Sequence, residues 1–337
     1  MIYIHIPFCE SFCIYCDFYS EIACGGNVGY ERFTGELCAE IRRRRKEIEA
    51  TRDCNTLYIG GGTPSVLPLS CLETVVRELG GAPFGEFTVE VNPEDICRRG
   101  ESYVRELLGL GVTRVSMGVQ SLSDDVLKWM RRRHDAAGAL RAYDILRRSG
   151  VENVSVDIIT GIGLPGFGKT LESTLDAVTG LAPEHVSAYQ LSIEDGSALA
   201  ERIASGAYTE AGEEECLEEY MHVCEKLGES GYGHYEISNW ALPGFEAVHN
   251  SLYWTRHPYA GLGPGAHSLS IGEDGTQVRS WNSRALSGWT SEREVLTPEE
   301  IREEEIMLGL RTSRGFGGRV LSEAEWFRSD SIISEMI

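Results

Sequence analysis

Short β-rich runs alternate with longer helical patterns through the first 195 residues, and this alternation is the feature that most constrains the fold. Strands that alternate with helices predict right-handed βαβ units and a parallel sheet. Six such strands suit an incomplete (β/α)6 barrel, in which reactive groups lie at the carboxyl ends of the strands. The predicted strands are Ile2–Ile6, Thr56–Ile59, Phe87–Val91, Arg114–Gly118, Val154–Ile159 and Val186–Ile193. Helical patterns lie near residues 30–50, 66–79, 94–110, 123–149 and 170–180.

The alternation of strand and helix patterns ends after about residue 195. A long helical stretch is predicted from about 210 to 230, and a region rich in Gly, Tyr and Trp follows from Tyr232 to Trp281. That composition predicts short strands and loops. From Thr297 the chain is rich in Glu and predicts helices. We therefore expect a partial barrel over residues 1–195, an accessory region over 196–296 and a helical domain over 297–337.

Composition excludes several classes of protein. The chain has 337 residues with a net charge of −21, which argues against broad binding to nucleic-acid phosphates. The basic run Arg42–Lys46 lies among glutamates in a helical pattern and is predicted to be a solvated helix face.

We find no leader pattern and no apolar run of about 18 residues, so we expect neither a secretion signal nor an integral membrane protein. Ten cysteines in such a chain indicate metal binding or catalysis in a reducing cytoplasm.

Three cysteines, Cys9, Cys13 and Cys16, fall within eight residues just after the first predicted strand. Iron–sulfur clusters are normally held by four cysteines, so three leave one iron without a protein ligand. A site with an open position indicates chemistry rather than a structural role. The alternative is a structural zinc site with a distant fourth ligand. Zinc sites usually show a second cysteine pair 12–20 residues on, whereas here the next cysteine, Cys24, stands alone. We therefore favour the open cluster.

Polar side chains and a glycine turn follow the later strands. Gly60-Gly61-Gly62-Thr63-Pro64 comes after the second strand, and glycines without Cβ let a backbone approach a ligand closely. Taken singly, each polar residue is compatible with a capped turn or an internal ion pair. A charged residue inside a buried strand, such as Asp157, is nevertheless costly unless it is paired or functional. The polar candidates at strand ends are Glu90, Gln120, Arg132 and Asp157.

Residues 163–170 fit the P-loop pattern G-x-x-x-x-G-K-T between a predicted strand and a predicted helix. Backbone N–H groups at a helix N-terminus would bind phosphate. A nucleotide site would also need a magnesium-binding acid after another strand, and a second cofactor would crowd the same barrel mouth. A P-loop nucleotidase is thus a disfavoured third candidate.

The cysteine spacing, with Tyr15 before the third cysteine, resembles the radical S-adenosylmethionine (SAM) superfamily. The resemblance implies that a 4Fe–4S cluster binds the amino and carboxylate groups of SAM through its open iron and, when reduced, cleaves the sulfonium to a deoxyadenosyl radical. It also implies that the Gly61-Gly62-Thr63 backbone receives the SAM amino group. The remaining implied SAM-site residues are Tyr3, Tyr15, Glu90, Gln120, Arg132 and Asp157.

Later strings narrow the resemblance to the branch that contains oxygen-independent coproporphyrinogen III oxidase and the HemW heme chaperone family. They are Ser187–Glu194, Tyr235–Trp240, Gly261–Ser268, Arg279–Asn282 and Met307–Arg311. The oxidase carries a further cysteine where this chain has Phe18. The chaperone family carries His-Asn-x-x-Tyr-Trp, which is intact here from His249 to Trp254.

The resemblance therefore implies a cytoplasmic heme chaperone that transfers heme to an apo-hemoprotein, such as a membrane-associated respiratory enzyme. Heme would bind around His249, Asn250, Tyr253 and Trp254, since histidine is a common axial ligand and aromatic faces pack on porphyrins. A cysteine or a residue in another loop is an alternative iron ligand. The rival is an enzyme of porphyrin biosynthesis that oxidatively decarboxylates coproporphyrinogen III. Family members usually extend further, so we expect the helical domain over 297–337 to be abbreviated.

Overall fold

The computed structural model describes residues 1–22 and 26–337, so Cys24 lies outside the described residues. Its centre is a curved sheet in the order β11-β1-β4-β5-β6-β7-β8-β10-β9. The incomplete parallel barrel predicted from the sequence is confirmed, because the six parallel strands stand side by side in chain order. They are β1 (Ile2–Ile6), β4 (Thr56–Gly61), β5 (Glu86–Val91), β6 (Arg114–Gln120), β7 (Val154–Thr160) and β8 (His185–Gln190).

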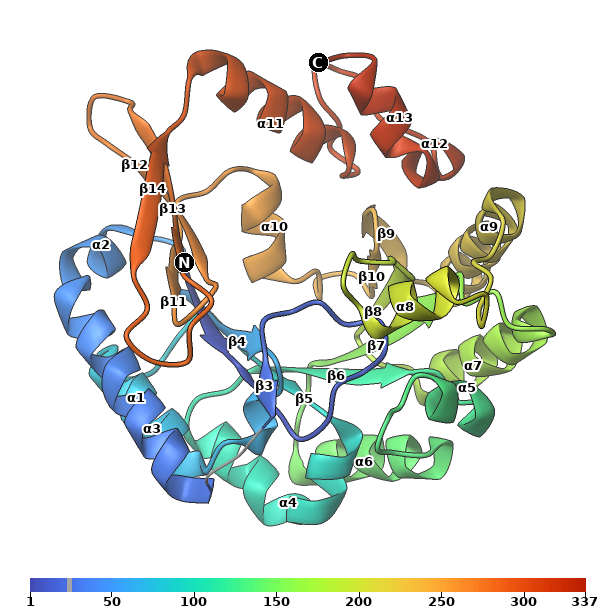
Figure 1. Cartoon of the computed structure of the whole chain (residues 1–337), viewed down its shortest axis with the longest axis horizontal. Helices are drawn as coiled ribbons and strands as arrows, with labels where there is room; N and C mark the ends of the chain where they lie inside the picture. Colours follow the sequence, from blue (N-terminus) through green and yellow to red (C-terminus); the bar gives the residue numbers. More distant parts are fainter. Residues whose placement is uncertain (23–25) are drawn as a thin grey trace.

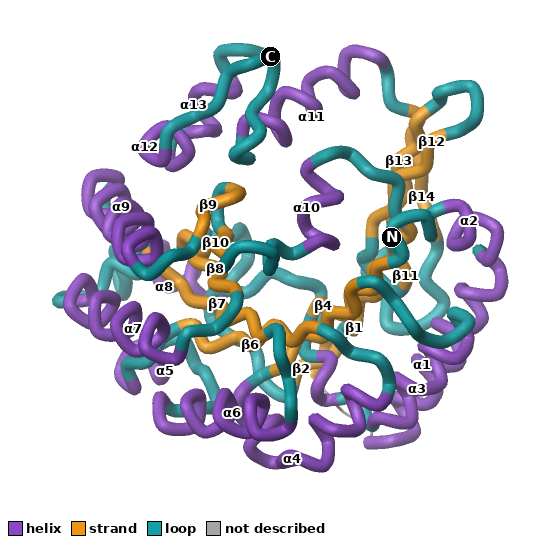
Figure 2. The backbone as a smooth tube through the Cα atoms, turned by 180° about the vertical axis from the view of Figure 1, so that it is seen from behind, coloured by secondary structure: helices purple, strands orange, loops and turns teal. Residues whose placement is uncertain are grey.

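Helices cover the outer face of this sheet, as the purple layer around the orange strands in Figure 2 shows. Strand residues such as Ile4, Phe87 and Val156 are fully buried, which explains the near-continuous apolar runs of the parallel strands. The helices along the barrel are α1 (Gly26–Arg43), α2 (Arg45–Ala50), η1 (Pro64–Val66), α3 (Leu69–Glu78), α4 (Pro93–Gly109), α5 (Asp124–Trp129), α6 (Ala136–Ser149) and α7 (Phe167–Leu181).

The second part of the chain extends the sheet at both of its edges (Figure 1). β11 (Ala260–Leu262) pairs parallel with β1, whereas β10 (Asn239–Ala241) and β9 (Gly233–Glu236) continue the sheet antiparallel beyond β8. A separate antiparallel sheet comprises β12 (His267–Ile271), β13 (Gln277–Asn282) and β14 (Ser291–Val295). The remaining elements are β2 (Phe8–Cys9), β3 (Glu21–Ile22), α8 (Ala198–Ala204), α9 (Glu213–Glu229), α10 (Val248–Trp254), α11 (Pro298–Leu310), α12 (Glu323–Phe327) and α13 (Ser329–Ser334).

Three sequence-based expectations need correction. The patterns at 30–50 and 123–149 each form two helices, and the last parallel strand ends at Gln190 rather than Ile193. The segment from Tyr232 to Trp281 is not only strands and loops, because it contains α10. The Glu86 carboxylate of β5 accepts the Val248 and His249 N–H groups at 2.9 and 2.8 Å. A helix N-terminus that is satisfied by a residue so distant in the sequence leaves no local signal.

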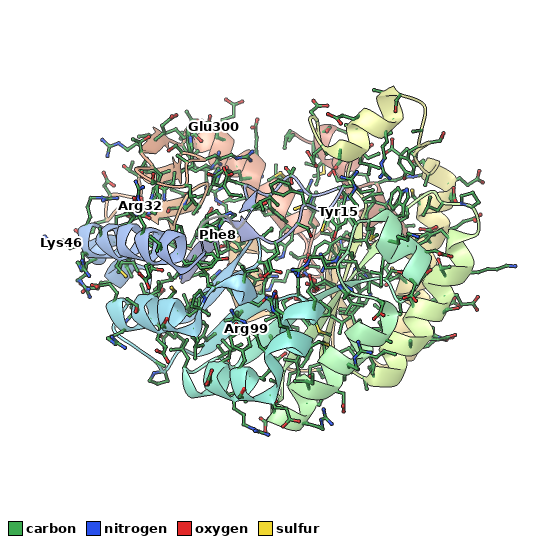
Figure 3. The ribbon with its side chains drawn as sticks, turned by 60° about the horizontal axis from the view of Figure 1, so that its bottom comes forward. Phe8, Tyr15, Arg32, Lys46, Arg99 and Glu300 are labelled. Carbon is green, nitrogen blue, oxygen red and sulfur yellow. The ribbon has the colours of Figure 1, made fainter. Side chains whose placement is uncertain are left out.

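Three arginines of the basic run form ion pairs with nearby glutamates. Arg42 and Arg45 both pair with Glu78 of α3, and Arg44 pairs with Glu40 and Glu47. Lys46 is exposed and lies at the left edge of the molecule in Figure 3. Arg42, Arg43, Arg45 and Lys46 are exposed, as the sequence predicts, whereas the Arg44 side chain is 13% exposed and donates to the Gly261 carbonyl at 2.6 Å.

Candidate functional site

A cavity of about 460 Å³ opens at the carboxyl ends of the parallel strands. Every cluster and SAM residue proposed from the sequence lines it, with the exception of Tyr3. Because carboxyl ends of parallel strands meet at one edge of a sheet, residues far apart in the sequence converge there. The predicted residues in the lining are Cys9, Cys13, Tyr15, Cys16, Gly61, Gly62, Thr63, Glu90, Gln120, Arg132 and Asp157.

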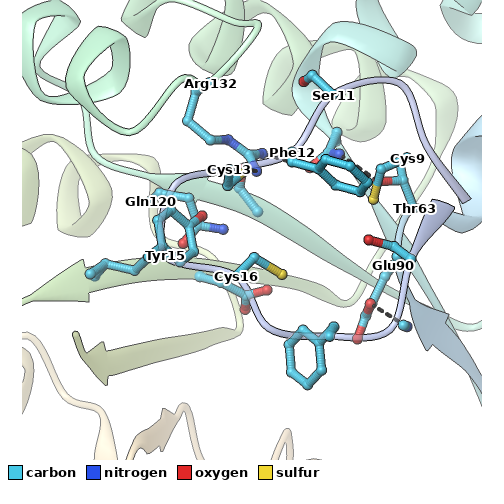
Figure 4. A pocket seen from close by; sticks show the side chains of 18 of the residues that line it. Cys9, Ser11, Phe12, Cys13, Tyr15, Cys16, Thr63, Glu90, Gln120 and Arg132 are labelled. Atoms are coloured by element: carbon cyan, nitrogen blue, oxygen red, sulfur yellow. Dashed lines mark hydrogen bonds between the residues drawn. The ribbon is translucent and has the colours of Figure 1, made fainter. Parts of the chain in front are cut away.

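The three cysteines lie on one loop that crosses the mouth of this cavity (Figure 4). They are free and half-buried, and Ile14 between them is fully buried. The Ile14 N–H donates to the Met130 carbonyl at 3.3 Å, and the Ile14 carbonyl accepts from the Leu199 N–H at 3.0 Å. Backbone bonds to two different parts of the chain therefore hold the loop over the cavity.

The thiols are spread rather than gathered on one point. Among the residues that the structure describes, the cysteine trio is not a set of ligand atoms within 4.8 Å of one another, as the ligands of one zinc ion would be. Burial raises the pKa of Cys9, and it raises the pKa of Cys16 to about 12. Without metal these two thiols are therefore protonated at neutral pH, and metal binding would release their protons. A polynuclear centre fits this donor set better than a single ion.

The glycine turn ties the cysteine loop to the sheet. Gly62 N–H donates to the Ile6 carbonyl at 2.8 Å, and Thr63 N–H donates to the Phe8 carbonyl at 2.7 Å. A Cβ on Gly62 would lie 2.7 Å from the Phe8 oxygen, which no real side chain tolerates. Glycine is needed here for close approach of two backbones. The Thr63 hydroxyl then lies 3.5 Å from the Cys9 sulfur.

Glu90 is held inside the cavity by two donors. The Tyr58 hydroxyl donates to it at 2.7 Å and the Gly61 N–H at 3.1 Å. Burial raises the pKa of Glu90 to about 7, and the Asp157 carboxylate adds to the rise against the effect of these hydrogen bonds. The carboxyl group is thus poised to change charge near neutral pH.

Asp157 has a comparable setting on β7. Ser116 donates to it at 2.9 Å and Ser155 at 3.2 Å. Burial raises the pKa of Asp157, with the Ser116 hydrogen bond opposing the rise. Gln120, at the end of β6, has a left-handed backbone (φ 66°) beside a register shift in the strand. Unusual backbone of this kind at a site edge is typical of functional positions.

Arg132 is the arginine of its triplet that contacts the cysteine loop. Its guanidinium donates to the Cys13 sulfur at 3.4 Å, to the Asn92 side chain at 2.6 Å and to the Gly118 carbonyl at 2.8 Å. Arg131 is exposed, and Arg133 pairs with Glu10. Figure 4 shows Arg132 beside Cys13 and Thr63 beside Cys9, on opposite sides of the cavity.

Tyr3 lies deeper in the barrel. Its hydroxyl contacts His5 Nδ1 at 3.0 Å, and its ring packs against Tyr58. It contacts the site indirectly, because Tyr58 holds Glu90 and the His5 ring packs against Gly61. Tyr15, in contrast, lies at the cavity near Gln120 (Figure 4; a wider view is in Figure 3).

The string from His249 to Trp254 forms α10, at the opposite end of the strands. His249 Nδ1 lies 2.9 Å from the hydroxyl of Thr56, the first residue of β4, and Nε2 lies 3.3 Å from the Tyr253 hydroxyl. The His249 residue is 1% exposed, and burial lowers its pKa to about 3. Asn250, Tyr253 and Trp254 are half-buried. The structure brings these four residues together on one helix but not to the cavity.

Comparisons with known proteins agree with this geometry. Residues 3–169 match the Radical SAM superfamily. The heme chaperone HemW of Lactococcus lactis is 34% identical over 323 residues, covering 93% of this chain and 82% of the relative. HemW of Bacillus subtilis is 32% identical, covering 95% and 86%. This chain belongs to the HemW family of radical SAM proteins.

A solved structure supports the same fold. Coproporphyrinogen III oxidase (HemN) from Escherichia coli, a radical SAM enzyme, superposes with a TM-score of 0.75 at 22% identity, covering 92% of this chain and 75% of that one. Among the residues that the structure describes in this HemW-family chain, no helix is both long and apolar enough to cross a bilayer.

The P-loop pattern of this HemW-family chain is not part of the cavity. Its lysine, Lys169, is exposed within α7, and the Thr170 hydroxyl donates to the Phe167 carbonyl at 2.7 Å. The hydroxyl that would bind magnesium in a P-loop thus forms a bond within the helix.

Sequence reasoning missed three residues of the site. Asn92 links Arg132 to Thr63, since its amide accepts from the arginine and donates to the threonine hydroxyl at 3.0 Å. Tyr58 and Ser116 hold the two carboxylates. Asn92 directly follows a strand, a signal that was available. The other two lie inside strands, where only the alternation of side chains places them on the barrel interior.

Proposed function

We propose that this chain is a heme chaperone that holds a 4Fe–4S cluster and SAM in the carboxyl-end cavity, binds heme and transfers it to an apo-hemoprotein. The observation that carries the proposal is the convergence of the cysteine trio with the SAM-type residues around one cavity, in a chain related to HemW proteins over most of its length. A reducing cytoplasm suits the free thiols, and a membrane-associated respiratory enzyme is the proposed acceptor.

The residues present fit the two cofactors. Cys9, Cys13 and Cys16, which line the cavity, would hold three irons of the cluster and leave one iron without a protein ligand. Bound together, a reduced cluster and SAM supply one-electron chemistry.

The surrounding residues would bind and orient SAM. Because an amino group donates its hydrogens, the SAM amino group would meet carbonyl oxygens of this turn, whose N–H groups already donate within the protein. Glu90 would accept hydrogen bonds from a ribose hydroxyl, and Asp157 and Gln120 offer further polar contacts. The Arg132 guanidinium would stabilise the Cys13 thiolate and limit access of water beside it.

Cluster binding is tested by substitution of one ligand. Cys13→Ser should abolish uptake of iron and sulfide during anaerobic reconstitution. Cys97→Ser is the matched control, because Cys97 is also half-buried but its sulfur donates to the Gly138 carbonyl at 3.3 Å. Tetrahedral zinc without sulfide uptake in the unsubstituted protein would overturn the cluster proposal.

Heme is the proposed cargo, and α10 is its proposed site. The His249 imidazole does not fit an axial ligand in the conformation described, since both nitrogens contact hydroxyls and the ring packs on Tyr58. Ligation by His249 would require α10 to move away from β4.

Heme binding is tested by the Soret band that heme added to the purified protein should give. His249→Ala should diminish the band if His249 is a ligand, while His222→Ala on α9 serves as control. An unchanged band would leave the chaperone proposal and remove His249 from it. Transfer of the heme to an apo-cytochrome, followed by its spectrum, tests the second half of the proposal.

The alternative is oxidative decarboxylation of coproporphyrinogen III, with which the fold shared with HemN is consistent. Phe18, exposed on the cysteine loop, occupies the position of the oxidase's further cysteine. Anaerobic incubation with reduced cluster, SAM and coproporphyrinogen decides between the two. Release of carbon dioxide with formation of protoporphyrinogen would overturn the chaperone proposal.

A further inference from the structure

Three metal-ligating side chains meet at the amino-terminal end of the sheet: Asp53, Cys54 and His257. One ligand atom of each lies within 4.8 Å of the others. His257 Nε2 lies 3.0 Å from the Asp53 carboxylate and 3.3 Å from the Cys54 sulfur. The cluster is distinct from the cavity, whose lining includes none of the three.

The backbone presents the first two residues on a tight turn. Asp53 and Cys54 are the central residues of a turn in which the Asn55 N–H donates to the Arg52 carbonyl at 3.0 Å. Asn55 has a left-handed backbone (φ 45°), and the Arg52 side chain donates to the Leu79 carbonyl at 2.5 Å. The turn between α2 and β4 is therefore held from both sides.

His257 is presented by the end of α10. Its N–H donates to the Leu252 carbonyl at 3.0 Å, and Arg256 before it has a left-handed backbone (φ 55°). This pattern of a left-handed residue and a bond back across the last turn is a common helix ending. Two independently fixed segments, about 200 residues apart in the chain, thus bring their side chains to one point.

The Met1 amino group also lies near Asp53 and Cys54, but the contacts of His257 are not explained by hydrogen bonding alone. The thiol and the carboxylate both approach the same nitrogen, Nε2, and a single N–H can point straight at only one of them. A nucleophilic Cys-His-Asp relay is also excluded, because it needs the acid on the other ring nitrogen. A cation attracts all three donors at once and has no such restriction.

We propose that Asp53, Cys54 and His257 bind a divalent cation of the zinc class, with a fourth position left to water or the nearby Met1 amino group. Thiolate, imidazole and carboxylate are the ligands that zinc prefers. Tetrahedral zinc bonds place sulfur and nitrogen about 3.6 Å apart and nitrogen and oxygen about 3.4 Å apart. The observed distances need to open by only a few tenths of an ångström. The Asp53 side chain is 64% exposed and that of His257 20%, so the cation can enter from solvent.

A cation at this point would join the end of α10 to the start of β4. His249 and Tyr253 lie on the same helix, and Thr56 begins the same strand. The site would therefore fix α10 in the position described, independently of whether heme binds there.

Cobalt(II) is the probe, since a bound thiolate gives it a charge-transfer band and tetrahedral geometry gives it intense visible bands. The full chain carrying Cys9→Ser, Cys13→Ser and Cys16→Ser removes the competing cavity thiols. It should bind one equivalent of cobalt with a thiolate band, and zinc should displace the cobalt. Cys54→Ser should abolish the thiolate band, and His257→Ala should weaken binding by roughly tenfold or more.

Cys224→Ser is the matched control. Cys224, His234 and Glu323 form a second candidate group, in which the sulfur lies farther from the imidazole, at 3.9 Å. Retention of the cobalt band in this variant supports the proposal. Loss of the band in Cys224→Ser, or its persistence in Cys54→Ser, would overturn it. So would thiolate-free cobalt binding in a chain whose circular dichroism matches that of the parent.

Discussion

The two ends of the parallel sheet both carry a string that resembles a cofactor motif, yet they fold into opposite environments. At the carboxyl end, polar residues surround an open cavity of about 460 Å³. At the amino end, His249 is 1% exposed, and both of its ring nitrogens contact hydroxyls. The carboxyl end retains polar groups that face a ligand-sized space, whereas the His249 ring at the amino end has satisfied both nitrogens within the protein.

The charged groups of the two ends differ in the same way. Burial raises the pKa of Glu90 to about 7, so this cavity carboxyl can change charge under ordinary conditions. Burial lowers the pKa of His249 to about 3, so this imidazole stays neutral. A group that titrates near neutrality beside a cavity is a better indicator of a ligand site than a string match alone. His249 therefore packs α10 against β4 rather than facing an open ligand site.

Gly62→Ala should give the largest effect, because it breaks the link between the carboxyl end and its cysteine loop. The added Cβ would lie 2.7 Å from the Phe8 carbonyl oxygen. Overpacking of this kind costs roughly 1–3 kcal/mol of unfolding free energy and should displace Cys9. Reconstitution should then fail or yield substoichiometric iron.

The control for that substitution is Gly35→Ala on α1. Gly35 is exposed, and a Cβ there meets nothing within 4 Å. Alanine favours helix over glycine by up to about 1 kcal/mol, so this variant should be slightly more stable with unchanged cluster content. Normal cluster loading in Gly62→Ala would refute the role assigned to the glycine turn.

Glu90→Gln tests the carboxyl end by its response to pH. If the carboxylate binds SAM, the affinity of the unsubstituted protein should fall about eightfold between pH 7.5 and pH 6, as Glu90 with a pKa of about 7 takes up a proton. The variant should bind SAM more weakly at pH 7.5 and lack this pH dependence. Equilibrium dialysis or calorimetry with the reconstituted protein provides the measurement.

Glu86→Gln is the matched control, since Glu86 is buried at the other end of the same strand. The substitution should leave SAM affinity unchanged. It should instead destabilise the start of α10, because the Glu86 carboxylate accepts hydrogen bonds from two N–H groups there. A pH dependence that persisted in Glu90→Gln would assign the titration to another group, such as Asp157.

The sequence predicted much of the fold because apolar runs in parallel strands are long and regular. β1 has the predicted bounds, and the other five parallel strands differ only at their ends. The predicted positions of the strand ends are less accurate, because strand termini depend on tertiary contacts. Gln120, with its left-handed backbone, is an example. α10 was not predicted, because Glu86 caps it from 162 residues earlier in the chain.

The convergence of the candidate residues on one cavity could be predicted for a similar reason. Residues at strand ends were found because parallel strands deliver them to one edge. Asn92, Tyr58 and Ser116 were not, because their role is to hold other side chains, and such contacts exist only after folding. The depth of His249 likewise depends on the curvature of the whole sheet and could not be read from its own string.

His249→Asn gives the smallest effect but tests the buried end most directly. Asparagine can keep a hydrogen bond to the Thr56 hydroxyl but cannot take up a proton in this pH range. Because the folded pKa of about 3 lies below the unfolded value of 6.5, the histidine favours unfolding as pH falls below 6.5. Between pH 7.5 and pH 5.5 the unsubstituted protein should lose about 1.4 kcal/mol more unfolding free energy than the variant.

His222→Asn controls for the loss of a histidine, and denaturant unfolding at each pH without heme is the measurement. Equal pH slopes for protein and variant would mean that His249 takes up protons in the folded state. The contrast between the two ends would then fail, and an imidazole open to iron would be the better description of α10.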